Sequence, residues 1–190
     1  MRILLPAGPA LLLAGVLLMA LPDAWTVSHV VFLAGTLVML PVAAALAGLT
    51  APVLGRVAQL LTALGALALA GQFLLDLAVD QLAADAAARG PLFDQLQSSP
   101  ALFLTLYAVG PSLLFAGLAL FGVGLLGRAP VPGWLLIAGT LLTGLSRIIE
   151  QWPVQAAGGA LILVALTMVS RSGPSRPVAR GRTVGSRTPA

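Results

Sequence analysis

The chain contains no cysteine, no lysine and no asparagine, and it has a single histidine. The absence of cysteine excludes disulfide bonds, thiol nucleophiles and cysteine-ligated metal sites. Zinc hydrolase chemistry requires several histidine ligands at set spacing, and one histidine does not supply them. Without asparagine the chain also lacks an acceptor for N-glycosylation.

Charged residues are also scarce. They make up 8% of the 190 residues, whereas a soluble domain carries about 25%. Hydrophobic residues make up 59%, and the mean hydropathy is +1.03. A soluble protein with so little charge could not cover its surface with polar groups, so we expect lipid to be the main solvent. The lack of lysine and asparagine in an alanine- and leucine-rich chain suggests a GC-rich bacterial genome.

Six apolar stretches come close to the length of about 20 residues that a helix needs to cross the hydrocarbon core. Because backbone polar groups in lipid must be bonded within their own segment, we expect these stretches to be helices. None has the period-2 alternation of a barrel strand. The predicted fold is an all-α, polytopic transmembrane helical bundle over residues 1–170. Its predicted spans are 3–21, 27–49, 57–79, 101–126, 131–149 and 154–170.

The first apolar stretch could instead be a cleaved signal peptide, with Arg2 as its charged start. The run from Ile3 to Leu21 is longer than a typical signal core. The sequence around Ala20 also lacks a clean small-x-small cleavage pattern. We therefore favour a retained span over a signal peptide.

The arginines predict the orientation of the bundle. With six spans, one side of the membrane holds eight of the ten basic residues, and the other holds only Arg89 and Arg147. The positive-inside rule then places both termini in the cytoplasm, which in a bacterium means the inner (plasma) membrane. The eight are Arg2, Arg56, Arg128, Arg171, Arg176, Arg180, Arg182 and Arg187.

The two longest segments outside the predicted spans are an outer loop and the C-terminal tail. In the outer loop, 80–100, we expect the third helix to continue to about Ala88 and to stop at Gly90-Pro91, after which 91–96 would lie flat on the membrane. Residues 171–190 form an Arg-rich tail without apolar periodicity, which we expect to be disordered and cytoplasmic. Its candidate contacts for anionic lipid headgroups are Arg171, Arg176, Arg180 and Arg182.

A hairpin between residues 117 and 139 carries a family resemblance. Residues 117–128 read Gly-Leu-Ala-Leu-Phe-Gly-Val-Gly-Leu-Leu-Gly-Arg, and residues 130–139 read Pro-Val-Pro-Gly-Trp-Leu-Leu-Ile-Ala-Gly. A glycine-studded span, a short Arg/Pro turn and a second glycine-containing span resemble small six-helix bacterial integral membrane proteins of unknown function. The resemblance implies a fold, and it carries over no activity and no functional residue.

Five ionisable residues form the main candidate site, because ionisable groups within a membrane are costly and mark functional positions. Asp76 and Asp80 share one face of the third span, and Arg147 and Glu150 lie near the outer end of the fifth. His29 lies at the outer start of the second span. One interpretation is an outward-facing polar cavity that binds a cation or a proton. The other is that these residues only end the spans, with Asp76 paired to Arg147.

Other chemistries have weaker support. A b-type haem usually needs two axial ligands, and the single histidine lies at an interface, so no cofactor is predicted. The letters of G-x-G-x-x-G occur at 122–127, but within an apolar span, where glycines let a neighbouring helix approach closely. The pI near 11.4 does not indicate nucleic-acid binding, because half of the arginines lie in the last twenty positions.

These patterns predict a non-enzymatic membrane protein that acts as a structural, regulatory or accessory component. No nucleophile–base pair and no metal-ligand set is visible. The expected partners are membrane lipids and either further copies of the chain or another membrane protein. The alternative is a small transporter or channel-like protein that uses the outward polar cluster. Transport ranks second because polar residues are scarce near the expected midplane, where transporters usually bind their substrates.

Overall fold

The computed structural model describes residues 4–85, 87–149 and 151–172, and within these ranges there is no strand. Between α5 and α6 lies a π-helix, η2 (Phe103–Val109), so residues 100–125 run as one helical segment. The predicted all-helical fold is therefore confirmed for these residues. The α-helices are α1 (Ala7–Met19), α2 (Trp25–Ala47), α3 (Pro52–Leu82), α4 (Arg89–Gln97), α5 (Pro100–Leu102), α6 (Gly110–Leu125), α7 (Pro130–Ile149) and α8 (Trp152–Arg171).

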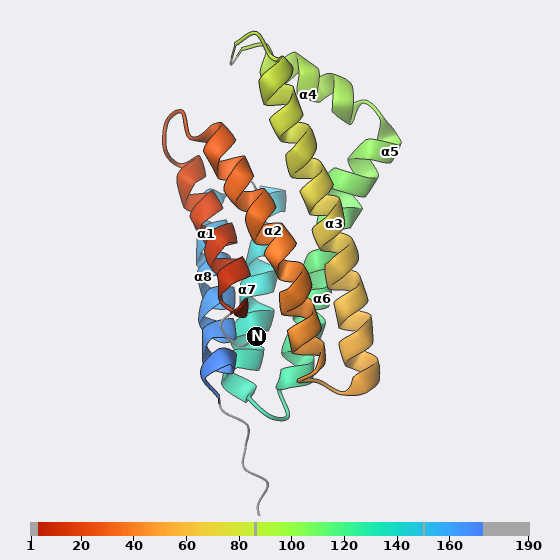
Figure 1. The fold of residues 1–190 in the computed structure, drawn as a ribbon, viewed down its shortest axis with the longest axis vertical. Helices are drawn as coiled ribbons and strands as arrows, with labels where there is room; N and C mark the ends of the chain where they lie inside the picture. The colour runs from red at the N-terminus through yellow and green to blue at the C-terminus, as the bar shows by residue number, and fades with distance from the viewer. Residues whose placement is uncertain (1–3, 86, 150, 173–190) are drawn as a thin grey trace, which may run out of the picture.

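Six of these helices form a closed ring (Figure 1). α1 packs against α2, α2 against α3, α3 against α6, α6 against α7, and α7 against α8. A contact between α8 and α1 closes the ring. Met39, Phe121 and Leu166, which are fully buried, belong to the apolar core between the helices. Apart from the contact between α8 and α1, neighbours in the ring follow the order of these six helices in the chain.

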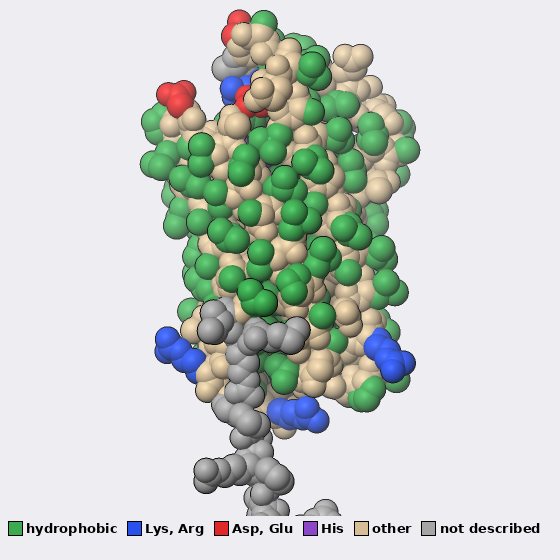
Figure 2. Space-filling view, viewed as in Figure 1, with side chains coloured by type: hydrophobic (Ala, Val, Ile, Leu, Met, Phe, Trp, Pro, Cys, Tyr) green, Lys and Arg blue, Asp and Glu red, His purple; other side chains and the backbone are tan. Residues whose placement is uncertain are grey.

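Among the described residues, four helical segments are long and apolar enough to cross a membrane: α2, α3, residues 100–125 and α8. The outer faces of the bundle carry exposed large apolar side chains, including Leu60, Leu104 and Leu141. Figure 2 shows this apolar surface along the bundle, with the charged side chains gathered near its two ends. An exposed apolar surface of this extent fits a lipid environment.

The first helix is shorter than the first predicted span. The sequence predicts a span over 3–21, whereas α1 covers Ala7–Met19. In the turn that leads to α2, Asp23 has a φ of 59°, a left-handed conformation that Asp tolerates better than most residues. At about 1.5 Å per residue, α1 is about 20 Å long, which is less than the hydrocarbon thickness of about 30 Å.

The segment beyond α3 also differs from the prediction. The sequence predicts that this helix continues to Ala88, but it ends at Leu82, and the next residue is extended (φ −70°, ψ 130°). Gly90 and Pro91 do not stop a helix. They lie in the first turn of α4, where a proline is tolerated because its nitrogen has no intrahelical acceptor. The predicted segment 91–96 is helical and forms part of α4.

Glycines set the closest helix contacts. A Cβ on Gly65 would lie 2.6 Å from the Cα of Leu114, and a Cβ on Gly117 would lie 2.6 Å from the backbone nitrogen of Thr62. Separations this short essentially never occur between real side chains and backbone, so only glycine allows α3 and α6 to approach so closely.

The glycines at 122–127 lie within and just after α6, and no strand precedes them in the described part of the chain. A Cβ on Gly122 would lie 3.0 Å from the carbonyl oxygen of Gly133 in α7. A Cβ on Gly124 would lie 2.7 Å from the side chain of Thr50. Gly122 and Gly124 therefore lie at close contacts, as the packing interpretation predicts, whereas a Cβ on Gly127 would meet nothing within 4 Å.

Candidate functional site

Asp76 is the centre of a buried polar cluster and is 4% exposed. Tyr107, on η2, donates a hydrogen bond from its hydroxyl group to Oδ1 of Asp76 at 2.7 Å. His29, on α2, places Nε2 3.6 Å from Oδ2 of the same carboxyl group. Gln72, one turn earlier on α3, is a further hydrogen-bond partner. Three helical segments thus converge on one carboxyl group, and these four residues are called the Asp76 cluster below.

His29 is positioned by its own helix. Its Nδ1 lies 2.8 Å from the carbonyl oxygen of Trp25, and the two rings lie 4.0 Å apart, centroid to centroid. Because a carbonyl oxygen only accepts hydrogen bonds, Nδ1 carries the proton of this bond. Nε2 is therefore the ring nitrogen that faces Asp76, 3.6 Å from its Oδ2.

Pro111 accounts for the π-helix that carries Tyr107. A proline has no N–H, so it cannot donate to a carbonyl group one turn earlier, and Gly110 bonds instead to the carbonyl oxygen of Thr105, five residues back. The carbonyl oxygen of Tyr107 accepts a long hydrogen bond, 3.5 Å, from the guanidinium group of Arg147 on α7. The altered turn thus supplies a main-chain acceptor to a charged side chain of the neighbouring helix.

A second cluster surrounds Asp80, one turn further out on α3. Arg89, at the start of α4, places Nε 2.7 Å from Oδ1 of Asp80, and the Thr26 hydroxyl group donates to Oδ2. The Arg89 guanidinium carbon lies 5.9 Å from the centroid of the Trp25 ring, and Phe93 of α4 meets that ring edge-on at 6.0 Å. These five residues, called the Asp80 latch below, fasten α4 to the start of α2 and the end of α3.

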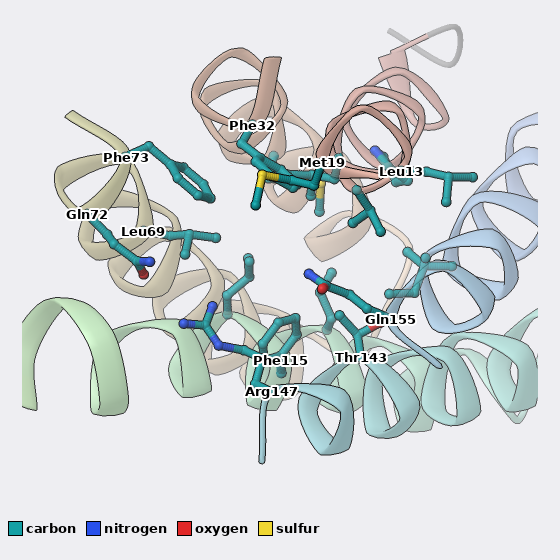
Figure 3. A pocket seen from close by; sticks show the side chains of 18 of the residues that line it. Leu13, Met19, Phe32, Leu69, Gln72, Phe73, Phe115, Thr143, Arg147 and Gln155 are labelled. Atoms are coloured by element: carbon teal, nitrogen blue, oxygen red, sulfur yellow. The ribbon is translucent and has the colours of Figure 1, made fainter. Parts of the chain in front are cut away.

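The ring of helices contains a partly open cavity of about 300 Å³, and all six helices contribute to its wall. Most of the wall is apolar, through residues such as Phe32, Leu69 and Leu118. Figure 3 shows Gln72, Arg147 and Gln155 directed into this space. The cavity therefore has an apolar body and a polar end, which lies near the start of α2 and the end of α7. The polar residues of its wall are His29, Gln72, Thr143, Arg147 and Gln155.

Three buried polar atoms have no hydrogen-bond partner among the described residues: Nε1 of Trp25, Oγ1 of Thr36 and Oε1 of Gln72. Buried polar atoms without a partner are uncommon in folded proteins, so each invites an explanation. Gln72 also lines the cavity. Its Oε1 is thus an acceptor that a molecule bound in the cavity could satisfy.

The structure brings part of the predicted polar cluster together. His29 and Asp76 are paired, and Arg147 lies on the cavity wall. Asp80 pairs with Arg89 in the latch. The second interpretation of the sequence pairs Asp76 with Arg147. In the described ranges, however, no ion pair joins these two residues. Glu150 lies outside the described residues, and binding of a cation or proton by this cluster stays a prediction.

The predicted lipid-contacting arginines fall mostly beyond the described chain. Arg171 is the last residue of α8 and is exposed. Arg176, Arg180 and Arg182 lie outside the described residues, as does the rest of the tail from residue 173. Their contacts with lipid headgroups therefore stay a prediction.

Sequence reasoning did not assign Tyr107, Thr26 or Arg89 to a polar cluster. Tyr107 is 31 residues from Asp76, and Thr26 is 54 residues from Asp80, so no spacing within one helix links these pairs. Arg89 carried a weak signal, since it is one of only two arginines on the predicted outer side and follows Asp80 closely.

Within the described ranges, no group of three or more histidine or acidic side chains is placed to hold a metal ion. Comparison of the chain with protein-family models, with curated proteins and with solved structures finds no match. A function for this chain must therefore be inferred from the cavity and the two polar clusters.

Proposed function

We propose that this chain is a six-span integral membrane protein of the bacterial inner membrane that binds an amphipathic small molecule within its helical ring. We further propose that it is non-enzymatic and acts as a regulatory or accessory component. The observation that carries the proposal is the cavity of about 300 Å³, apolar along most of its wall and polar at its outer end. Ligand pockets commonly begin at about this size, and a few polar groups orient the ligand.

The proposed topology has both termini in the cytoplasm. An even number of alternating spans returns the chain to the side where it began, and the contact between α1 and α8 is compatible with this path. Arg56 near the start of α3, Arg128 between α6 and α7, and Arg171 at the end of α8 then face the same side, which supports a cytoplasmic assignment. With only 13 residues in α1, flanking residues or local bilayer thinning would complete the first span.

Native mass spectrometry of the full chain, released gently from its own membrane, tests the binding function. We expect a stoichiometric additional mass in the range of a small lipid. Gly159→Leu should abolish this mass, because Gly159 lines the cavity and a Cβ there has room, lying 3.5 Å from the Leu13 side chain. Ala157→Leu, on an exposed position of the same helix, should retain it. A bare wild-type chain, or equal mass retention by both variants, would overturn the proposal.

A small transporter or channel-like protein is the second candidate. The buried pair of His29 and Asp76, which lies beside the cavity, favours it. Proteoliposomes loaded with a pH-sensitive dye would show proton flux that His29→Ala abolishes. If the dye reports no flux that depends on His29 while the additional mass is retained, the protein binds a ligand without transporting protons.

A further inference from the structure

Arg147 has the chemistry to select the headgroup of a bound molecule. Its guanidinium group is always charged and offers five N–H donors. The hydrogen bond to the Tyr107 carbonyl oxygen is long, at 3.5 Å, and in the described part of the chain no carboxylate lies within 4.0 Å of Arg147. Asp76 interacts with it electrostatically, but that carboxyl group is already engaged by Tyr107 and His29. Arg147 therefore retains donors for a ligand.

Gln72 adds a second requirement for the ligand, which is a hydrogen-bond donor. Its Oε1 is buried, has no partner among the described residues, and belongs to a side chain of the cavity wall. An amide oxygen only accepts hydrogen bonds, so the ligand must bring a donor to it. Gln155, from α8, is directed into the same space and offers both an acceptor and donors (Figure 3). A headgroup that both accepts from Arg147 and donates an O–H to Gln72 satisfies this end of the cavity.

The rest of the cavity is shaped for hydrocarbon. The rings of Phe32 and Phe73 are stacked, with centroids 5.0 Å apart and planes inclined by 7°, and both line the wall. His29 and Met39 also line it, and ten residues of a helix rise by about 15 Å, so the cavity extends well into the bundle. A chain of methylene groups can lie along this wall and gain about 0.8 kcal/mol for each buried methylene.

We infer that the cavity binds a single-chain amphiphile whose headgroup is a carboxylic acid or a phosphate monoester. This inference rests on the proposed binding function and adds the class of ligand. The headgroup lies between Arg147, Gln72 and Gln155, and the hydrocarbon chain lies against Phe32 and Phe73. A phosphate monoester that carries one proton offers anionic oxygens to the guanidinium group of Arg147 and an O–H to Gln72. A protonated carboxylic acid offers its carbonyl oxygen to Arg147 and its O–H to Gln72, whereas an ionised carboxylate forms paired hydrogen bonds with Arg147 alone.

Photo-crosslinking of the full chain in nanodiscs tests the ligand class. The probe is palmitic acid with a diazirine near the end of its chain, and the competitors are palmitate, hexadecyl phosphate and hexadecanol. We expect the probe to label the cavity wall, and hexadecanol to compete about tenfold less well than the acids, because hydrogen bonds to charged groups are the stronger ones. Competition by palmitate alone identifies a carboxylate headgroup, and competition by hexadecyl phosphate alone identifies a phosphate ester; either result supports the inference.

Variants distinguish recognition of the headgroup from binding of the hydrocarbon chain in the cavity. Arg147→Gln should weaken competition by the acids about tenfold and leave hexadecanol unchanged, while Arg147→Lys should keep the preference for acids. Gln72→Leu should weaken competition by the acids without changing which residues the probe labels. Arg128→Gln, at the opposite end of the bundle, is the matched control and should change nothing. Circular dichroism and a single gel-filtration peak establish that each variant is folded.

Two unfavourable results have different meanings. If wild-type protein prefers hexadecanol or shows no preference, or if Arg147→Gln keeps the preference for acids, the headgroup inference is wrong while binding in the cavity stands. If the probe does not label the cavity wall and Gly159→Leu leaves all labelling unchanged, the proposed binding function fails together with the inference.

Discussion

Asp76 is a carboxyl group on the inner face of a bundle whose outer surface is apolar, and its surroundings explain how this burial is tolerated. An ionised carboxylate in such a place is costly unless it is paired and hydrogen-bonded. The Tyr107 hydroxyl group, the His29 ring and the Gln72 side chain supply these partners. Because the partners come from α2, α3 and η2, one side chain also fixes how these segments pack against each other.

Tyr107→Phe should lower the stability of the protein. The change removes a hydrogen bond of 2.7 Å and leaves Oδ1 of Asp76 without its phenolic donor, which costs about 1–3 kcal/mol for a buried group. Thermal unfolding in a fixed detergent would show this as a lower midpoint. Thr105→Val, which removes an exposed hydroxyl group from the same π-helix, is the matched control and should leave the midpoint unchanged. Equal midpoints for wild type and Tyr107→Phe would contradict the assigned role of this bond.

Individual site residues were predictable from the sequence only where their own chemistry is unusual for a membrane. His29, Asp76 and Arg147 are identifiable because ionisable groups are rare in apolar helices. Tyr107 and Gln155 are ordinary in such helices, and their importance arises only when a distant segment faces them. The pairing of Asp76 with His29 instead of Arg147 depends on helix rotation, which spacing along one chain does not determine.

Among the helical elements, α4 is the one attached mainly through polar contacts. The Asp80 latch joins it to α2 and α3 through the ion pair with Arg89 and the stacking of Arg89 and Phe93 near Trp25. No residue of α4 itself is fully buried. The attachment of the element therefore depends on a few side chains, and we expect the ring to keep its packing when α4 loosens.

Arg89→Ala should loosen α4 selectively. A partly exposed ion pair contributes up to about 1 kcal/mol and a cation–π contact about 0.5–1 kcal/mol, so backbone amides of α4 should exchange with deuterium roughly tenfold faster. Hydrogen exchange followed by mass spectrometry would report this, with the helices of the ring unchanged. Asp94→Asn, on the exposed side of α4, should have no effect. Faster exchange throughout the ring would show that the latch supports more than α4.

The contact between α3 and α6 depends on glycine. Gly117→Val should destabilise the bundle by about 1–3 kcal/mol or prevent its assembly, because the new side chain meets the backbone of Thr62 and Ala58. Fluorescence-detected gel filtration of a tagged chain after heating would show an earlier loss of the folded peak. At Gly127, where a Cβ meets nothing within 4 Å, Gly127→Ala should leave the peak unchanged. A heat-stable Gly117→Val protein would rule out close packing at this position.

At the level of elements, most helices were predictable and their ends were not. Long apolar runs predict α2, α3, α7 and α8 because lipid requires helices there. The end of α3 at Leu82 was missed, since the polar stretch after it remains compatible with a helix until tertiary contacts of Asp80 and Arg89 redirect the chain. The π-helix before Pro111 was missed as well, because a proline can be accommodated by a kink or by a wider turn.

For the whole molecule, the proposed topology has a direct test because the chain has no native cysteine. Single cysteines would be introduced by Ser98→Cys before α5, Gly127→Cys between α6 and α7, and Leu4→Cys ahead of α1. In intact spheroplasts a membrane-impermeant thiol reagent should label the first variant only, and after lysis it should label all three. Labelling of Leu4→Cys together with Ser98→Cys from outside would show that α1 does not cross the membrane. Labelling of Leu4→Cys and Gly127→Cys from outside, without Ser98→Cys, would reverse the orientation.

Each helix of the ring packs against its chain neighbours, and the remaining contact of the ring joins α1 to α8. During synthesis, the helices from α1 to α7 therefore form an open arc as they leave the ribosome, one after another. The arc becomes a closed wall only when α8 arrives, and α8 also brings Gln155 and Gly159 to the cavity. The nascent chain thus completes the wall of its cavity in a single late event, and a chain cut before Trp152 would leave one side of that cavity without a helix.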